Sequence, residues 1–459
     1  MCFLHAQYPI FYRIARVHRR YLTTGPRGSI MRYTFLGAFC PTTLFAAEEQ
    51  MKQQRNFATV TISRKGQAAL EGGHPWVYEG EVRALEGTPA PGDLVDVISD
   101  KTRYLGTGFY SPQSKIRVRL VSRNANDKFD DAFWQRRLRW AWEYRKQVMG
   151  PDTDCCRLIF GEADSLPGLT VDRFGDVLVT QTLSVGIEQR KGVLFPLLVQ
   201  ILREDGQQIR AVYERNDVAL RAREGLAEGK GFFDLGDGAD PGPTETQITE
   251  NGIHYRVDFE NGQKTGYFLD QKYNRQAVAR MAHGRHVLDC FTHTGSFALN
   301  AAAGGAASVT AVDISEAAVQ MARTNAVLNG LEGSMQFQTV NVFDLLPQLE
   351  RAGGSPYDFI ILDPPAFTKS RSTVDAAMRG YKEINYRAMK LLPRGGYLAT
   401  ASCSHFAPLP LFIKMLHSAA ADAGVQLRQI EVRGQAPDHP VLWNVEETDY
   451  LKFFLFQVL

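Results

Sequence analysis

Residues 286–313, HVLDCFTHTGSFALNAAAGGAASVTAVD, contain the pattern that decides the fold. The run HVLDC is typical of a buried strand, the segment after it begins as a loop and becomes a helix, and SVTAVD predicts a second strand ending at Asp313. A further helix is expected over SEAAVQMARTNAVLNG, residues 315–330. This strand, helix, strand unit predicts a parallel α/β sheet, in which ligands bind beyond the carboxyl ends of the strands.

The loop between strand and helix indicates the kind of ligand. An acid at the end of the second strand can accept both ribose hydroxyls of a nucleoside, and Asp313 lies there, 24 residues after Asp289. A nicotinamide dehydrogenase would use the same geometry, but it needs a GxGxxG loop to close on a pyrophosphate. The loop FTHTGSF has one glycine, Gly295. It therefore favours S-adenosylmethionine, which carries no phosphate.

Two later strand ends extend this hypothesis. MQFQTV ends at Asn341 and Val342, where a polar side chain and a backbone N–H could hold an adenine edge. YDFIILDPPAF places Asp363 at the end of a fourth buried strand, and its two prolines fix the backbone so that the carboxylate can face a planar, nitrogen-bearing substrate. With the closing strand pair QLRQIEVRG and YLKFFLFQVL, the pattern predicts a methyltransferase. Substrate contacts are expected from Pro364, Pro365 and Phe367.

The region from Ala58 to about Arg123 consists of short strands and turns, which predict a small β-barrel. Its last strand, KIRVRLV, alternates hydrophobic residues with three cations, which we call the basic strip: Lys115, Arg117 and Arg119. The strip is either a solvated outer face or a surface that contacts RNA phosphates. The segment GHPWVYEG resembles PUA domains, which are small RNA-binding barrels, and favours the second interpretation.

A middle α+β region follows. A helix is predicted at about 130–147 with an apolar stripe of Trp134, Leu138, Ala141 and Trp142, and another from Lys191 to Glu204. The segment FGEADSLPGLTVDRFGD, residues 160–176, brings three acids close together in sequence. We interpret it as acidic Gly/Pro turns rather than as a catalytic site.

Composition limits the remaining possibilities. The chain has 459 residues, a net charge of +2 and six cysteines without a CxxC pair, so no metal site is expected and a reducing cytoplasm is the simplest location. No run of eighteen apolar residues predicts a membrane span. The first fifty residues carry six arginines and no acid before Glu48. We expect residues 1–56 to be an extension that arises from a start codon assigned too early, and residues 1–50 to be absent from the mature protein or dispensable.

The motifs together resemble one family. GQKTGYFLDQKYNR, VLDCFTHTGSFAL, AVDIS, LDPPAFTKS, ASCSHF and APDHP are similar to consecutive motifs of bacterial class I 23S rRNA 5-methylcytosine methyltransferases with an N-terminal PUA domain. The resemblance implies a PUA-like domain at 57–125, a middle α+β domain and linker at 126–245, and a Rossmann-like methyltransferase domain at 246–459. The cofactor-binding residues it implies are Asp289, Phe291, Thr292, Thr294, Gly295, Asp313, Ile314, Asn341, Val342 and Asp363.

The same resemblance implies that Cys403 and Asp363 are catalytic and that ribosomal RNA, in a single-stranded or looped region of 23S rRNA, is the partner. Carbon 5 of cytosine is a weak nucleophile, so a thiolate must first add to carbon 6. Three alternatives stay open: Cys403 is only a buried packing residue, the DPPAF site methylates an exocyclic amine or a guanine ring nitrogen, or the chain is an RNA-binding protein with an inactive cofactor fold. The target nucleotide, naked RNA or subunit precursor as substrate, and homodimer formation are also left open.

Overall fold

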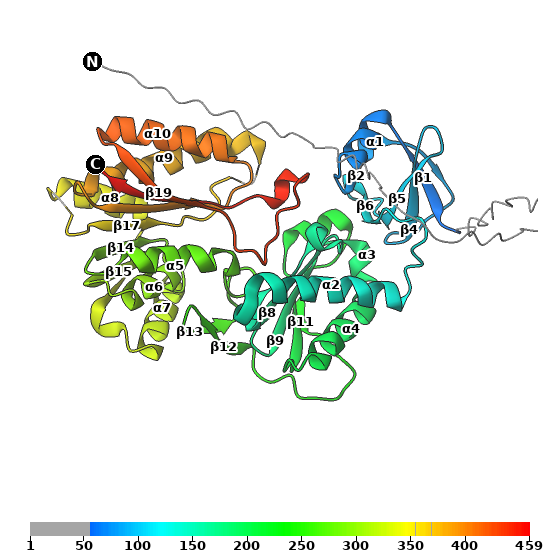
Figure 1. Ribbon diagram of the computed structural model, residues 1–459, viewed down its shortest axis with the longest axis horizontal. Helices are drawn as coiled ribbons and strands as arrows, with labels where there is room; N and C mark the ends of the chain where they lie inside the picture. Colours follow the sequence, from blue (N-terminus) through cyan, green and yellow to red (C-terminus); the bar gives the residue numbers. More distant parts are fainter. Residues whose placement is uncertain (1–55, 354, 369) are drawn as a thin grey trace, which may run out of the picture. The chain divides into compact units, whose positions relative to one another are not determined.

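The computed structural model describes residues 56–353, 355–368 and 370–459 (Figure 1). Almost all of the predicted extension at residues 1–56 lies outside the described residues, so that hypothesis stays a prediction. No helix in the described part of the chain is both long and apolar enough to cross a membrane.

The first sheet contains the strands expected from the N-terminal pattern. Val118 and Leu120 are buried in its core, as the alternation in KIRVRLV predicts. One helix, α1 (Arg64–Glu71), was not predicted; it begins where the Ser63 hydroxyl accepts a hydrogen bond from the Gly66 N–H at 3.2 Å. The strands pair in the order β2-β6-β5-β4-β1-β3. Their bounds are β1 (Ala58–Ile62), β2 (Trp76–Tyr78), β3 (Val82–Glu86), β4 (Leu94–Ser99), β5 (Tyr104–Tyr110) and β6 (Ile116–Ser122).

The middle region is a five-stranded sheet in the order β11-β10-β9-β8-β7, with two longer helices. Helix α2 (Asp131–Met149) buries the predicted apolar stripe, and α4 (Lys191–Glu204) has the predicted bounds. The interpretation of residues 160–176 as turns is wrong in part, because β8 lies there and buries Asp172 completely. The remaining elements are β7 (Cys155–Phe160), β8 (Leu169–Phe174), β9 (Val177–Thr182), α3 (Val185–Glu188), β10 (Ala211–Arg215) and β11 (Lys230–Phe232).

A hairpin of β12 (Glu245–Glu250) and β13 (Ile253–Asp258) leads into a seven-stranded sheet with the order β16-β15-β14-β17-β18-β20-β19. The first five strands of this order are parallel, and β20 runs antiparallel to both of its neighbours, as the closing pair predicts. The strands are β14 (His286–Cys290), β15 (Ser308–Asp313), β16 (Met335–Thr339), β17 (Phe359–Leu362), β18 (Tyr397–Ser402), β19 (Leu427–Arg433) and β20 (Lys452–Val458). This is the predicted Rossmann-like fold.

Helices cover both faces of this sheet, so its central strands β14, β17 and β18 are buried on both sides (Figure 1). Alternate residues of β14 enter different cores: Val287 packs with α5 (Lys272–Met281), α6 (Ser296–Ala303) and α7 (Glu316–Leu328), whereas Leu288 packs with the helices of the other face. Those helices are α8 (Val342–Arg351), α9 (Val374–Leu391) and α10 (Leu409–Ala423). The side chains that follow the strand ends therefore lie on one edge of a rigid support.

Candidate active site

The loop after β14 has a backbone that few sequences can adopt. Phe291, His293 and Gly295 have φ values of 64°, 51° and 83°, in the left-handed region. A Cβ on Gly295 would lie 2.9 Å from the Cβ of Ala322, so the close approach of α7 also requires glycine there. Left-handed non-glycine residues are costly and concentrate at functional sites. The loop is thus held in one shape before α6, and the Thr292, His293 and Gly295 N–H groups donate to acceptors within the protein.

Asp289 lies fully buried in β14, directly before this loop. One carboxylate oxygen accepts hydrogen bonds from the Thr292 hydroxyl at 2.6 Å and from the Ala298 N–H at 3.0 Å. The other oxygen is closed off from solvent and has no partner among the described residues. Burial raises the pKa of Asp289 to about 7. An ammonium group such as the amine of S-adenosylmethionine would supply the missing donor, so this residue fits the cofactor.

Asp313, the last residue of β15, is held by backbone N–H groups. Its two carboxylate oxygens accept from the His293 N–H and the Ser315 N–H, each at 3.0 Å. Neither contact uses a charged partner, so the carboxylate keeps acceptor capacity for the hydroxyls of a ribose. Ile314, the next residue, is 71% exposed, which leaves an apolar side chain beside the carboxylate at the same edge.

The predicted adenine contacts on the next strand are used partly for structure. The Asn341 side-chain oxygen accepts from the Phe343 N–H at 3.0 Å and caps α8. The Val342 side chain is buried, with only 2% of the residue exposed, so only its backbone can contact a ligand. Thr294, also expected at the cofactor, has a buried hydroxyl without a partner among the described residues.

Asp363 follows β17 and is joined to a residue that the sequence did not indicate. Its carboxylate accepts from the Gln271 side-chain amide at 2.9 Å. Burial, and then the nearby Asp270 carboxylate, raise the pKa of Asp363 to about 7. A carboxyl group with that pKa is partly protonated near neutral pH, so it can act both as a donor and as an acceptor toward a ring nitrogen.

The segment after Asp363 has a buried Pro364 and an exposed Pro365. Phe367 is not a free stacking surface, because its ring packs against Tyr381 at a centroid distance of 4.6 Å and against Phe343 at 5.8 Å. The sequence did not predict this aromatic cluster.

Cys403 follows the end of β18 and is partly exposed, unlike the fully buried Cys155, Cys156 and Cys290. Burial, and then the Asp363 carboxylate, raise the pKa of the Cys403 thiol to about 11, while Lys264 and Lys452 lower it. Lys452 is almost completely buried, and its ammonium donates to the Ser404 carbonyl at 2.6 Å and to the Tyr450 carbonyl at 2.8 Å. The cysteine therefore lies at the same edge as Asp363, next to a buried cation.

Four of these residues were missed by the sequence analysis: Lys264, Asp270, Gln271 and Lys452. Three belong to the quoted motif GQKTGYFLDQKYNR, in which Lys264 pairs with Asp270 at 3.7 Å. Gln271 lies 92 residues from Asp363 along the chain, and Lys452 lies 48 residues from Ser404. The signal was the polar motif itself, but its partners could not be identified without the fold.

The basic strip is not a row of free cations. Lys115 is exposed, whereas Arg117 pairs with Glu79 at 2.6 Å and Arg119 pairs with Glu162 at 3.2 Å and with Glu224 at 3.1 Å. The Arg119 side chain is 13% exposed. Two of the three predicted RNA contacts are thus neutralised by carboxylates within the protein.

Comparisons with known proteins concern the domains, the sequence and the fold. An S-adenosylmethionine-dependent methyltransferase family model matches residues 238–457, and a PUA-like domain model matches residues 60–123. A ribosomal RNA large subunit methyltransferase I of Erwinia tasmaniensis is 43% identical over 388 residues, which are 84% of this chain and 96% of the relative. Relatives of the same name from Klebsiella pneumoniae and Escherichia coli O139:H28 are 40% and 41% identical, over 88% and 84% of this chain and 99% and 96% of their own.

Solved structures show the same fold. One from Streptococcus mutans, described as a SAM-dependent methyltransferase, has a TM-score of 0.72 and 22% identity, and covers 87% of this chain and 99% of its own. Another, a methyltransferase complexed with SAH, has a TM-score of 0.73 with the same identity and coverage. At that identity the likeness concerns the arrangement of the elements.

Proposed function

Because this chain belongs to the family of ribosomal RNA large subunit methyltransferases I, we propose that it methylates carbon 5 of a cytosine in large-subunit ribosomal RNA. The observation that carries the proposal is the placement of Cys403 beyond β18, at the edge where Asp363 follows β17. A family of this kind would work in the cytoplasm, where the RNA is.

S-adenosylmethionine is the cofactor, and when bound it supplies an electrophilic methyl group. Asp289 would hold its amine, Asp313 its ribose hydroxyls, and Ile314 with the backbone of Val342 its adenine. The unpartnered oxygen of Asp289 and the N–H-held carboxylate of Asp313 support these roles. Thr292 positions Asp289 by donating to its other oxygen.

Cys403 would begin the reaction as a thiolate. Its sulfur forms a bond to carbon 6 of the cytosine, and the electron pair of the ring double bond shifts so that carbon 5 becomes nucleophilic. A proton from the Asp363 carboxyl to ring nitrogen 3 would neutralise the negative charge that develops in the ring. After methylation, water accepts the carbon 5 proton, the restored ring double bond expels the Cys403 thiolate, and ring nitrogen 3 returns its proton to the Asp363 carboxylate. Lys452 supports the first step because its charge lowers the pKa of the Cys403 thiol.

The target base must leave its stack to reach Asp363 and Cys403, as in other enzymes that act on a base. Unstacked bases of loops and single strands are the common targets of sequence-specific RNA recognition. We therefore propose a single-stranded or looped region as the substrate, with the barrel of β1–β6 as part of the RNA-binding surface.

A mechanism-based trap tests this function. RNA that contains 5-fluorocytosine lacks the carbon 5 proton, so the cysteine adduct cannot be resolved after methyl transfer. Wild-type protein with S-adenosylmethionine should form a covalent complex that survives denaturing electrophoresis, and Cys403→Ala should not. Mass mapping of the methylated base gives a second readout. If mass mapping finds methylation of an amine or a guanine ring nitrogen, and no complex is trapped, the DPPAF site methylates nitrogen and the carbon 5 proposal is wrong.

A further inference from the structure

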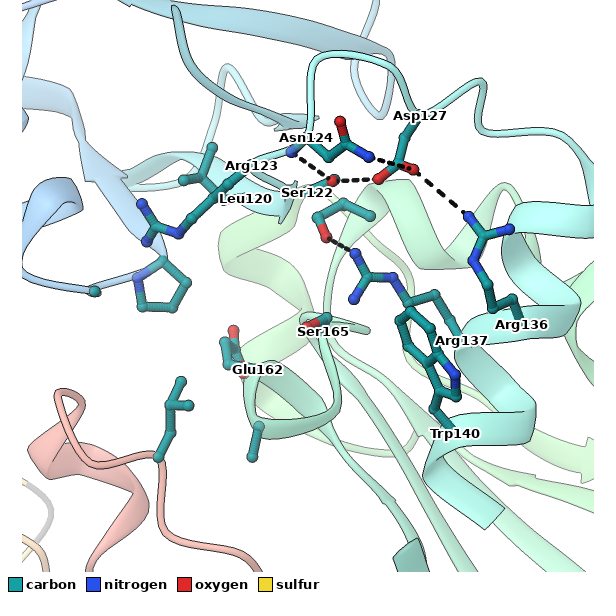
Figure 2. Close-up of a pocket in the computed structure, with 15 residues that line it drawn as sticks. Leu120, Ser122, Arg123, Asn124, Asp127, Arg136, Arg137, Trp140, Glu162 and Ser165 are labelled. Atoms are coloured by element: carbon teal, nitrogen blue, oxygen red, sulfur yellow. Dashed lines mark hydrogen bonds and ion pairs between the residues drawn. The ribbon is translucent and has the colours of Figure 1, made fainter. Parts of the chain in front are cut away.

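A cavity lies away from the methyltransferase edge, between the end of β6, helix α2 and the turn at residues 161–165 (Figure 2). It has a volume of about 610 Å³, and we call it the barrel groove. Its lining includes Arg123, Arg137 and Trp140. Pockets of about 300–1,000 Å³ are typical of sites for small ligands.

Two arginines face the barrel groove without an anionic partner. Arg123 donates only to backbone carbonyls, those of Leu70 at 2.6 Å and His74 at 3.1 Å. Arg137 donates weakly to the Val121 carbonyl at 3.4 Å, and its buried Nε has no partner. Neither guanidinium forms an ion pair within the described part of the chain. Burial lowers the pKa of both groups, and for Arg137 the Asp127 carboxylate acts in the opposite direction without offsetting the effect of burial. Arg123 is exposed as a whole residue.

The carboxylates that line the barrel groove do not fill this role. Asp127 pairs with Arg136 at 3.5 Å and accepts from the Ser122 hydroxyl at 2.5 Å. Glu162 accepts from the Trp76 indole at 2.8 Å and pairs with Arg119 at 3.2 Å. Each acid already has a donor or cation of its own. The Asp127 carboxylate also acts on Arg137, but this arginine forms no ion pair within the described chain and can bind an anion from outside it.

Trp140 gives the barrel groove an aromatic surface. The apolar stripe of α2 buries Trp134 and Trp142, whereas Trp140 is 56% exposed. The guanidinium carbons of Arg136 and Arg137 lie 5.8 Å and 5.4 Å from the centre of its ring. An exposed indole beside cations is the combination that single-stranded RNA sites use, with base stacking and phosphate contact side by side.

We propose that the barrel groove binds a nucleotide of single-stranded RNA that flanks the methylated base, with the base on Trp140 and a phosphate on Arg137. The proposal rests on RNA being the substrate but not on which atom is methylated. Arg117 and Arg119 of the basic strip form ion pairs within the protein. The proposal therefore moves the RNA contact from these two residues to the barrel groove.

The test measures RNA binding apart from methyl transfer. Trp140→Ala and Arg137→Gln are titrated with a fluorescent single-stranded oligocytidylate and with protein-free large-subunit rRNA, in the presence of S-adenosylhomocysteine. The matched control is Arg139→Gln, because Arg139 lies on the same helix, has 44% side-chain exposure like Arg136, and does not line the barrel groove. Each groove variant should weaken binding about tenfold, and Arg139→Gln should change it less than twofold.

Ultraviolet cross-linking then locates the contact. Wild-type protein bound to 4-thiouridine-substituted RNA should give a cross-linked peptide that contains Trp140, and Cys403→Ala should give the same peptide because it retains the groove. Thermal melting of Trp140→Ala and Arg137→Gln checks that weak binding is not unfolding. Equal RNA affinity of the folded groove variants and the control, or cross-links confined to other surfaces, would overturn the proposal. A missing 5-fluorocytosine trap with an intact groove effect would overturn only the carbon 5 chemistry.

Discussion

The middle region and the methyltransferase edge each contain a group of three carboxylates. The two groups differ in their partners: arginines in the middle region and uncharged donors at the edge. In the middle region, Asp164 binds Arg145 through two hydrogen bonds of 2.5 and 2.8 Å, and Asp172 binds Arg157 at 2.7 and 2.8 Å. Glu162, the third, pairs with Arg119. At the edge, Asp289, Asp313 and Asp363 bind only hydroxyl, amide and backbone N–H donors, and none forms an ion pair with a described residue.

The difference changes the acidity of the groups. Burial would raise the pKa of Asp172, but Arg157 more than offsets this and lowers it. Burial raises the pKa of Asp289 and Asp363 to about 7 because neither carboxylate is ion-paired, and for Asp363 the more distant charges of Arg275 and Lys264 do not offset it. Paired carboxylates hold the fold together, whereas carboxylates without cations keep binding capacity for a ligand. Sequence proximity, which made residues 160–176 resemble a catalytic cluster, does not distinguish the two cases.

The largest expected effect concerns cysteines of the same two regions. Cys403→Ala should reduce methyl transfer at least about a thousandfold, because it removes the nucleophile that forms the carbon 6 bond in the proposed mechanism. Cys156→Ala, in the middle region, removes a buried thiol that donates to the Thr153 carbonyl and should leave the rate nearly unchanged. Single-turnover assays with radiolabelled cofactor measure both. Near wild-type transfer by Cys403→Ala would mean that Asp363 works on an amine or a ring nitrogen.

A pair of Asp→Asn variants separates catalysis from stability. Asp363→Asn should slow transfer about 10² to 10⁴-fold with no loss of stability, because the folded protein disfavours the ionised carboxylate. Asp164→Asn should cost about 3 to 5 kcal/mol of stability, because Arg145 is fully buried and would lose its carboxylate. Denaturant unfolding and single-turnover rates are measured for both variants. If Asp363→Asn unfolds as easily as Asp164→Asn, the comparison between the two regions fails.

Asp313→Ala should weaken S-adenosylmethionine binding by about 2 kcal/mol, or about thirtyfold, because the ribose hydroxyls lose a charged acceptor. RNA affinity should be unchanged. Asp422→Ala is the control, because Asp422 pairs with Lys382 on the surface. Calorimetry that finds equal cofactor affinity for Asp313→Ala and Asp422→Ala would place the ribose elsewhere.

The smallest expected effect is a change in how the single-turnover rate depends on pH. The protonated fraction of Asp363 falls above pH 7, while the thiolate fraction of Cys403 rises tenfold per pH unit until about pH 11. Their product makes the wild-type single-turnover rate rise up to about pH 7 and then level off. Asp363→Asn, whose amide donates at any pH, should be slower but should keep rising through pH 9. A wild-type rate that also rises above pH 7 would show that the ionised carboxylate is the active form.

Local pattern was sufficient for much of the fold. The apolar runs 286–290 and 308–313 and the helix 191–204 have the predicted bounds, because each is long or apolar enough to determine its own structure. Helix α1 was missed since its eight residues include Gly66 and bury only that glycine and Leu70. The strand β8 was hidden by the Gly and Pro residues that precede it.

The residues of the candidate site also fall into two sets, those that local pattern predicts and those that depend on distant contacts. Asp313, Asp363 and Cys403 could be predicted because each follows a strand, and the carboxyl ends of these strands meet at one edge. Gln271 and Lys452 could not, because their roles depend on contacts between distant segments. The basic strip shows the converse: Arg119 has the right charge and spacing, but its partners Glu162 and Glu224 lie 43 and 105 residues away.

Gly295 has a consequence for suppressor genetics. Two separate restraints act at this position, the left-handed φ of 83° and the Ala322 Cβ that would lie 2.9 Å from a new side chain. Ala322→Gly can relieve the second restraint but not the first, since a left-handed backbone costs an L-residue about 1 to 2 kcal/mol wherever its neighbours lie. A selection for second-site revertants of Gly295→Ala should therefore recover true revertants to glycine, while changes at Ala322 restore only part of the growth.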